Sequence, residues 1–314
     1  MGRLLVSGSL AYDRILDFNG VFAEHILPEK IHQLSVSFFV PNLTESYGGN
    51  AGNIAYTLSL LGAKPAVVST AGNDFAPYEA WLQEHGVDLS LVERDAEHRT
   101  AFATIMTDTK DNQITAFYPG AMLSAYPLDE LALSKDDFVI VGTSNPDTLR
   151  ALPALCRERG VHGFLFDPGQ QIPTLSGDDL KNGIEGTAAL TVNDYELELV
   201  KEKTGWSEGD ILEHAEALVV TLGEQGSRIT TKEATIDIPA AKTTGVVDPT
   251  GAGDAYRAGF VAARAKGLSL EIAGKAGSVA ACYAIEATGT QNHSFTTEEF
   301  ATRYAENFNE TITL

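Results

Sequence analysis

The second half of the chain alternates short apolar runs with longer segments whose apolar positions recur at helical spacing. The runs are typical of buried strands, and the segments are typical of helices that cover a sheet. We expect strands at 138–141, 163–166, 189–192 and 217–222, and helices at 147–159, 178–184, 194–203, 251–266 and 270–286. Because the connections are short, this alternation predicts βαβ units and an α/β fold with a mostly parallel central sheet flanked by helices.

The first half mixes this pattern with a second one. The first pattern predicts a strand at 3–6, a helix at 50–61 that stops before Gly62, a strand at 66–69 and a helix at 78–85. Residues 31–40 alternate in polarity like a half-exposed strand, and strand-like runs follow at 100–107 and 113–118, joined by a polar turn at 108–112. We group these three runs as a small sheet inserted in two pieces, at about 13–40 and 100–118, into one domain spanning 1–314.

Charge and cysteine content narrow the class of protein. With 22 basic and 43 acidic residues the net charge is −21, so a nucleic-acid or anionic-membrane surface is not expected. The two cysteines give no disulfide framework or four-ligand zinc site. No secretion-signal pattern or sufficiently long apolar run occurs, so we expect a cytoplasmic protein with no membrane partner.

The segment 248–260 carries the most informative chemistry. Its residues Gly251, Ala252 and Gly253 form a Gly-rich turn that enters a helix, so several backbone N–H groups can point at one anion. Asp254 adds a carboxylate in the first helical turn. An acid beside an anion hole repels a simply bound phosphate, but it suits phosphoryl transfer, because it can accept the proton of an attacking hydroxyl. The alternative is an acid that merely favours the helix dipole.

The whole segment resembles the signature of the ribokinase-like (PfkB) carbohydrate kinases. A second pattern of that family stands at 47–55, Tyr-Gly-Gly-Asn-Ala-Gly-Asn-Ile-Ala. The resemblance implies a ribokinase-like fold with a small β-sheet lid, ATP as phosphoryl donor and Asp254 as catalytic base. Within the family the closer similarity is to bacterial adenosine kinases, which the stretches at 8–13, 34–38, 117–122, 167–171, 193–196 and 204–208 carry.

The resemblance also implies sites for the nucleotide and for cations. Asn193 and Glu196 match the element that helps to hold Mg²⁺, although this spacing alone more often forms a helix cap. Thr221, Gly223 and Gly226 match a turn at the nucleotide, where Thr250, Gly251 and Gly253 also bind; alone, the turn would be an ordinary hairpin entry. Asp248 and Thr250 stand where relatives that bind a monovalent cation have ligands, which makes K⁺ a candidate cofactor.

The acceptor expected from the resemblance is the 5′-hydroxyl of adenosine. Ribose needs polar anchors and a purine needs flat apolar partners, so we expect Phe102 and Phe117 to sandwich the base, with core packing of either ring as the alternative. The other candidate acceptor-binding residues are polar groups or the glycines of the second motif: Ser9, Asp13, Ser37, Gly48, Gly49, Asn53, Gln170 and Gln171.

Two other functions stay open at this stage. One is a kinase of the same family that acts on a sugar such as ribose or fructose. The other is a non-catalytic ligand-binding protein on a kinase scaffold. The resemblance also implies a homodimer through the lid strands, and Arg257 is expected either to touch phosphate or to form a structural salt bridge.

Overall fold

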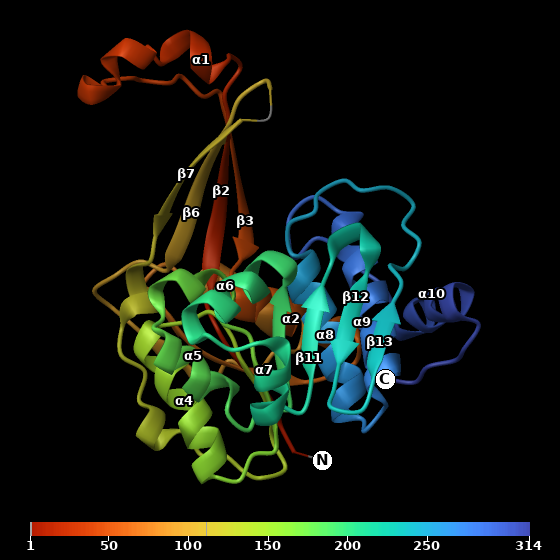
Figure 1. Cartoon of the computed structure of the whole chain (residues 1–314). Coiled ribbons are helices and arrows are strands. Elements are labelled where there is room, and N and C mark those ends of the chain that lie inside the picture. The colour runs from red at the N-terminus through yellow and green to blue at the C-terminus, as the bar shows by residue number, and fades with distance from the viewer. Residues whose placement is uncertain (1, 111) are drawn as a thin grey trace.

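A nine-stranded sheet forms the centre of the molecule, which the computed structural model describes over residues 2–110 and 112–314 (Figure 1). The strand order is β13-β12-β11-β10-β9-β8-β1-β4-β5. Every pairing is parallel except those of β12 with β11 and β13, which confirms the mostly parallel α/β fold. The strands are β1 (Leu4–Ser7), β4 (Pro65–Ala71), β5 (Val92–Arg94), β8 (Phe138–Val141), β9 (Gly163–Phe166), β10 (Ala189–Asn193), β11 (Leu218–Thr221), β12 (Ser227–Thr230) and β13 (Thr235–Ile238).

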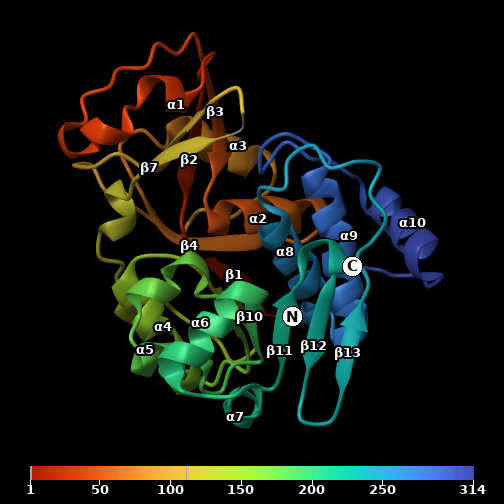
Figure 2. The same cartoon turned by 45° about the horizontal axis from the view of Figure 1, so that its top comes forward.

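Helices cover both faces of this sheet (Figure 2). One layer contains α2 (Asn50–Leu60), α3 (Ala76–Glu84), α8 (Ala252–Ala265), α9 (Leu270–Ile285) and α10 (Thr297–Phe308), and the other contains α4 (Pro146–Glu158), α5 (Gly177–Ile184), α6 (Asp194–Thr204) and α7 (Glu208–His214). Successive strand residues point to opposite layers: Val6 lies in the core beneath α2 and α8, whereas Leu5 lies in the core beneath α4. Burial on both faces explains why the strands read as continuous apolar runs.

A second, four-stranded sheet rises from one edge of the body, as Figure 1 shows. Its order is β3-β2-β6-β7, with β2 (Ala11–Asp17), β3 (Asn42–Gly48), β6 (Ala101–Thr107) and β7 (Gln113–Tyr118). β2 pairs parallel with β6, and the other two pairings are antiparallel. The outer end carries α1 (Phe22–His25) and the 3₁₀ helix η1 (Pro28–Gln33).

The strand predicted at 31–40 is wrong. Its first residues belong to η1, and the remainder is a segment without strand pairing. The alternation arises because Phe38 turns inward, where its ring lies 5.0 Å from that of Phe18 and 5.2 Å from that of Phe22, while Phe39 is 85% exposed. The strands at this side of the small sheet are β2 and β3, which the hydrophobic pattern did not predict.

Among the other connections, those at 119–137 and 239–251 are long. Four further 3₁₀ turns are η2 (Gly120–Leu123), η3 (Leu128–Glu130), η4 (Gly169–Thr174) and η5 (Gly223–Gln225). Part of the predicted turn at 108–112 lies outside the described residues, because it includes Asp111; across it the Asp108 N–H donates to the Asn112 carbonyl at 3.0 Å. Within the described residues no helix is long and apolar enough to cross a membrane.

Candidate active site

The predicted catalytic segment lies at the carboxyl edge of the parallel strands, where α/β sheets bind their ligands. α8 begins there, with Gly251 as its N-cap in the left-handed region at φ 82°. The N–H of Ala252 donates to the Pro249 carbonyl at 3.3 Å. In the described part of the chain the N–H groups of Gly251 and Gly253 have no acceptor. The anion turn therefore offers two of its three predicted donors.

Two asparagine side chains hold the carboxylate of Asp254. Asn50 Nδ2 donates to Oδ1 at 2.8 Å, and Asn53 Nδ2 donates to Oδ2, also at 2.8 Å. Both asparagines lie in the first turn of α2, and their spacing of three residues places them on one face of that helix. Sequence reasoning named Asn53 but missed Asn50, although the same spacing was a visible signal.

Gly48 and Gly49 allow this arrangement. Gly49 has φ 85°, and a Cβ there would lie 2.6 Å from the Ser9 carbonyl oxygen and 2.7 Å from the Ala11 nitrogen. The backbone at Gly49 therefore passes directly against the start of β2, which sets the direction in which α2 leaves. The Ser9 hydroxyl accepts the N–H of Asn50 at 3.1 Å, and its predicted contact with the acceptor stays a prediction. This hydrogen bond helps to fix the first residue of α2.

Charged groups surround Asp254. Burial raises its pKa, and the nearby Asp167 carboxylate acts in the same direction, while Arg257, Asn53 and Asn50 oppose it. Arg257 Nη2 donates to Asp167 Oδ1 at 2.7 Å, and this ion pair is buried, with the side chains 9% and 3% exposed. Of the two roles expected for Arg257, the structure therefore shows the salt bridge.

Asp13 is the second acid at this edge. It lies on β2 two residues after Ala11, which pairs with Gly48 of β3, and a Cβ added at Gly48 would come 2.4 Å from Asp13 Oδ2. Burial, together with the negative charges of Asp254 and Asp248, raises the pKa of Asp13 to about 6. The structure therefore brings Asp13, Asn53 and Asp254 together, as the sequence predicted.

The predicted sandwich of Phe102 and Phe117 is wrong. Phe102 is paired with Tyr12 and Tyr118, whereas Phe117 is paired with Ala103, which is paired with Asp13. Because neighbouring residues of a strand point to opposite faces, the two rings lie on opposite faces of the small sheet. Phe117, 53% exposed, shares the face of Asp13, while Phe102 lies beneath the Arg14 guanidinium at 4.2 Å.

Ser37 is also not brought to this edge. It is exposed and lies beside Phe38, whose ring packs against Phe18, the residue that follows the end of β2. Gln170 and Gln171 lie in η4, after β9. Gln171 Nε2 donates to the Ser144 carbonyl, and its Oε1 is buried without a donor among the described residues. Gln170 is exposed.

Asn193 and Glu196 form the N-terminal cap of α6. Asn193 Oδ1 accepts the N–H of Glu196, and Glu196 Oε2 accepts the N–H of Asn193, both at 2.8 Å. Burial raises the pKa of Glu196, and the negative charges of Asp167 and Asp254 act in the same direction. The helix cap, which was the alternative to a Mg²⁺ site at these two residues, is thus present. The same oxygens lie in a negative field that suits a cation, and a hard cation held partly by waters needs few protein ligands.

The predicted nucleotide turn lies next to this cap. Thr221 ends β11 and pairs with Asn193, which ends β10. The turn η5 follows, with Gly223 at φ 58° and Gly226 at φ 88°. Its Gly226 carbonyl accepts the N–H of Leu222 at 2.8 Å. The Asn193 and Thr221 elements, far apart in sequence, therefore meet at one edge.

Asp248 organises the turn that leads to α8. Its Oδ1 accepts the N–H of Thr250, and its Oδ2 accepts the N–H of Gly289, both at 2.9 Å. Burial alone would raise the pKa of Asp248, but these hydrogen bonds outweigh it and the pKa is lowered. The candidate K⁺ ligands thus lie next to the anion turn and fix its backbone.

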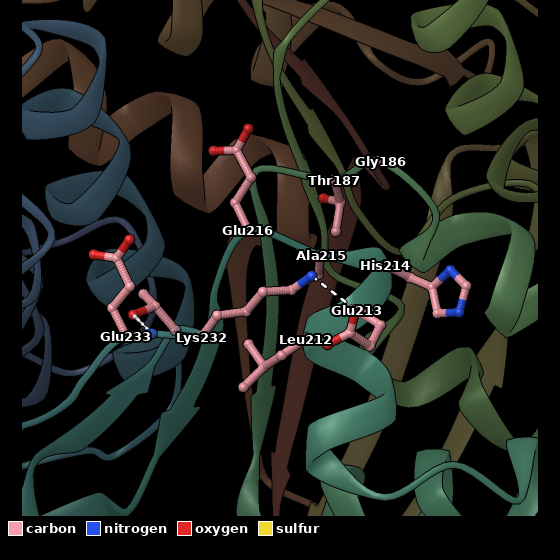
Figure 3. Close-up of a pocket in the computed structure, with 10 residues that line it drawn as sticks. Gly186, Thr187, Leu212, Glu213, His214, Ala215, Glu216, Lys232 and Glu233 are labelled. Carbon is pink, nitrogen blue, oxygen red and sulfur yellow. Dashed lines mark hydrogen bonds and ion pairs between the residues drawn. The ribbon is translucent and has the colours of Figure 1, made fainter.

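A separate open pocket of about 440 Å³ lies at the opposite edge of the sheet (Figure 3). Its lining includes Thr187 and Glu216, which precede β10 and β11, and Lys232, which donates to Glu213 at 2.9 Å. It therefore lies at the amino ends of the strands and contains none of the predicted site residues.

Comparison with known proteins places this geometry in a family. The model of the pfkB family of carbohydrate kinases matches residues 18–297. The nucleoside kinase of Methanocaldococcus jannaschii is 36% identical over 267 residues, 84% of this chain and 87% of its own length. The structure of the Burkholderia thailandensis nucleoside kinase in complex with inosine is 36% identical, with a TM-score of 0.88 over 98% of this chain and 100% of that one.

These similarities confirm the ribokinase-like fold. PfkB kinases transfer a phosphoryl group to a hydroxyl, so the activity is that of a phosphotransferase with an alcohol acceptor. A carboxylate held at the start of a Gly-rich helix is the arrangement that such a transfer requires. The chain therefore belongs to the pfkB family of carbohydrate kinases.

Proposed function

We propose that the chain phosphorylates the 5′-hydroxyl of a nucleoside, with adenosine as the acceptor, ATP as the donor and AMP as the product. The observation that carries the proposal is the position of Asp254, held by two amides beside Gly251 and Gly253, whose N–H groups have no acceptor among residues 2–110 and 112–314. The similarity to nucleoside kinases from two organisms supports a nucleoside rather than a free sugar.

In this proposal Asp254 takes the proton of the attacking hydroxyl. Each of its oxygens accepts one amide N–H and keeps a further lone pair for that proton. The N–H groups at the start of α8 stabilise the negative charge on the group being transferred. Asp13 accepts a hydrogen bond from a ribose hydroxyl, with Asn53 and the Gly48–Gly49 backbone beside it.

The base of the nucleoside lies against the Asp13 face of the small sheet. Phe117 supplies a ring on that face. Ile15 and Ile105, which pair with each other two residues beyond Asp13 and Ala103, extend the apolar surface of the same face. Gln170 and Gln171 contact the edge of the base from η4. Movement of the small sheet toward α8 would cover the acceptor and exclude water from the transfer.

Mg²⁺ accompanies ATP in this proposal, held by Asn193 and Glu196 through water. When bound, Mg²⁺ neutralises charge on the phosphate oxygens. Thr221, Gly223 and Gly226 contact the nucleotide together with Thr250. Asp248 and Thr250 hold K⁺, whose effect would be on the backbone of the anion turn.

We also assign a homodimer to the small sheet. Four apolar residues, Leu43, Leu16, Met106 and Ile114, form one row across all four strands. This row lies on the face opposite Asp13, and Leu43 and Ile114 are 61% and 42% exposed. A second copy would cover the row. We expect Ile114→Lys to convert a dimer into a monomer in analytical ultracentrifugation; a monomeric unmodified protein would contradict the dimer.

The acceptor is tested with MgATP and a panel of adenosine, inosine, guanosine, cytidine, ribose and fructose. ADP release is measured for each, and the product is identified by mass spectrometry. We expect the highest kcat/KM with adenosine and a nucleoside 5′-monophosphate as product. Preference for a sugar would replace the nucleoside by a sugar acceptor, and no ADP release with any acceptor would support the non-catalytic alternative.

A further inference from the structure

A line of polar side chains leads from Trp81 on α3 to Asp254 on α8. Trp81 Nε1 donates to Gln291 Oε1 at 3.2 Å, Gln291 Nε2 donates to Asn53 Oδ1 at 3.0 Å, and Asn53 Nδ2 donates to Asp254 Oδ2 at 2.8 Å. Gln291 is 2% exposed and Asn53 is 5% exposed. These four residues, which we call the amide relay, join the helices α3, α2 and α8 beneath the site.

The amide relay has a fixed direction. An indole N–H can only donate, so Gln291 must turn its oxygen toward Trp81 and its NH₂ group toward Asn53. Asn53 must then turn its oxygen toward Gln291 and its own NH₂ group toward Asp254. The reverse orientation of Asn53 would place a carbonyl oxygen against the carboxylate. The donor-only indole at one end and the acceptor-only carboxylate at the other therefore favour the same orientation of the Asn53 amide.

Tyr78 completes the hydrogen bonding of Gln291. Its Oη accepts the second Nε2 hydrogen of Gln291 at 2.5 Å, and its hydroxyl donates to the Gly48 carbonyl at 2.8 Å. A rotated Gln291 amide would leave buried groups unpaired, which is costly. Gly52 leaves room for these groups, because a Cβ there would lie 1.9 Å from Tyr78 Oη. This close approach explains the third glycine of the 47–55 motif.

Asn50 provides an internal comparison. It also donates to Asp254, but its Oδ1 is buried without a donor in the described part of the chain. Among the described residues, Asp254 is the one side chain to which Asn50 Nδ2 donates a hydrogen bond. Asn53, in contrast, is oriented from behind by Gln291, independently of the charge on Asp254.

We propose that Gln291 and Trp81 are positioning residues for the reaction, because they lock the Asn53 amide with its NH₂ group toward the carboxylate of Asp254. This inference rests on the proposed role of Asp254 as the base. A donor held toward a carboxylate favours its charged form. The amide relay therefore keeps Asp254 able to accept a proton in a buried, negatively charged site.

The test replaces Gln291 by Met, which has a similar length and no amide. We expect kcat with MgATP and adenosine or inosine to fall by about tenfold, with KM for the nucleoside nearly unchanged. The apparent pKa of Asp254, followed by ¹³C NMR of labelled aspartate and assigned against Asp254→Asn, should rise by about one unit. The acid limb of the kcat profile should move by the same amount.

The charged and titratable groups that face Asp254 are retained in this variant. They are Arg257 on α8, Asp167 after β9, Glu196 on α6, Asp13 on β2 and Tyr78 on α3. A change in the pKa of Asp254 would therefore report the loss of the relay.

A double-mutant cycle separates the relay from a general packing effect. Trp81→Phe should lower kcat in the same direction but less, and Trp81→Phe with Gln291→Met should be no worse than Gln291→Met alone. Trp206→Phe is the matched control, since Trp206 stacks on His214 at 4.4 Å, outside the site, and should leave kcat unchanged. The relay would be overturned if the kcat losses of the two single variants multiplied in the double variant. An unchanged pKa of Asp254 in folded Gln291→Met would overturn it as well.

If Gln291→Met does not fold, Trp81→Phe decides the question alone, because an unaltered pKa of Asp254 in that variant also overturns the relay. The proposed function fails separately. Normal turnover by Asp254→Asn would remove Asp254 as the base. An inactive Asp254→Asn, combined with unchanged relay variants, would leave the base in place and remove only the roles of Gln291 and Trp81.

Discussion

Asn53 donates from Nδ2 to Oδ2 of Asp254 at 2.8 Å, although 201 residues separate the two in the chain. This contact joins the start of α2 to the start of α8. Each of the two sequence motifs therefore supplies one half of a single site. The site depends on backbone geometry at both helix starts, and its parts can be tested separately.

Gly49→Ala should disrupt the start of α2. The added Cβ would lie 2.6 Å from the Ser9 carbonyl oxygen, and φ is 85°. We expect a loss of kcat together with a loss of stability beyond the roughly 1–2 kcal/mol of a left-handed alanine. Gly86→Ala is the matched control, because Gly86 has φ 78° and no atom of the described residues lies within 4 Å of the added carbon. Equal urea midpoints for the two variants would contradict the close contact at Gly49.

Arg257→Met should leave the carboxylate of Asp167 buried without its partner. We expect unfolding free energy from urea titration to fall by about 3–5 kcal/mol. Adding Asp167→Asn should restore part of that loss, since the unpaired charge is removed. Arg228→Met breaks an exposed pair, with side chains 52% and 69% exposed, and should cost less than about 1 kcal/mol. A similar cost for both single variants would argue against a buried charge pair.

Asp13→Asn should stabilise the protein in a pH-dependent way. Because the folded pKa of Asp13 is raised from 3.8 to about 6, the native state binds more protons than the unfolded state between these values. The ionisation of Asp13 therefore lowers stability as pH rises through 6. We expect the variant to gain up to about 3 kcal/mol at pH 8 and much less at pH 4.

The same variant should bind the nucleoside more weakly, because Asp13 is proposed to accept a ribose hydroxyl. Asp17→Asn, at the exposed outer end of the same strand, is the control for both measurements. A stability difference of the same size at pH 4 and pH 8 would show that the charge of Asp13 is not the cause.

Phe117→Ala and Phe102→Ala should have different effects, because the two rings lie on opposite faces of the small sheet. Loss of a stacked ring is worth about 1–3 kcal/mol, so Phe117→Ala should raise the nucleoside KM by roughly 5- to 150-fold. Phe102→Ala should leave KM nearly unchanged and lower the thermal midpoint, since it removes the ring beneath Arg14. The reverse result would place the base on the other face.

The central sheet could be predicted because its strands and helices are local patterns. Phe138–Val141 and Gly163–Phe166 are buried on both faces, and their apolar runs match the observed strands. β2 and β3 could not be found in this way. β3 is mostly polar, and β2 mixes apolar and charged residues without a regular alternation. Their pairing with each other and with β6 decides their structure. Residues 31–40 show the converse case, an alternating pattern without a partner strand.

The site residues show the same contrast between local patterns and contacts with distant segments. Asp254 lies within one short motif and could be identified from it. The partners of Asp254 and Arg257 come from distant segments: Asn50 was missed despite its spacing from Asn53, and nothing local in the sequence joins Asp167 to Arg257 or Gln291 to Asn53. Phe102 and Phe117 lie on opposite faces of the small sheet because of the register in which the strands pair. Two isolated aromatic residues in a sequence do not reveal that register.

The central claim is that Asp254 removes the proton from the acceptor hydroxyl. Its most direct test compares kcat with nucleoside binding in Asp254→Asn, which keeps the size of the side chain and removes its basicity. Asp147→Asn, with a 92% exposed side chain at the start of α4, is the control. We expect kcat to fall by about 10²–10⁴-fold, while the nucleoside Kd from calorimetry stays close to that of the unmodified protein. A kcat near normal would contradict the claim.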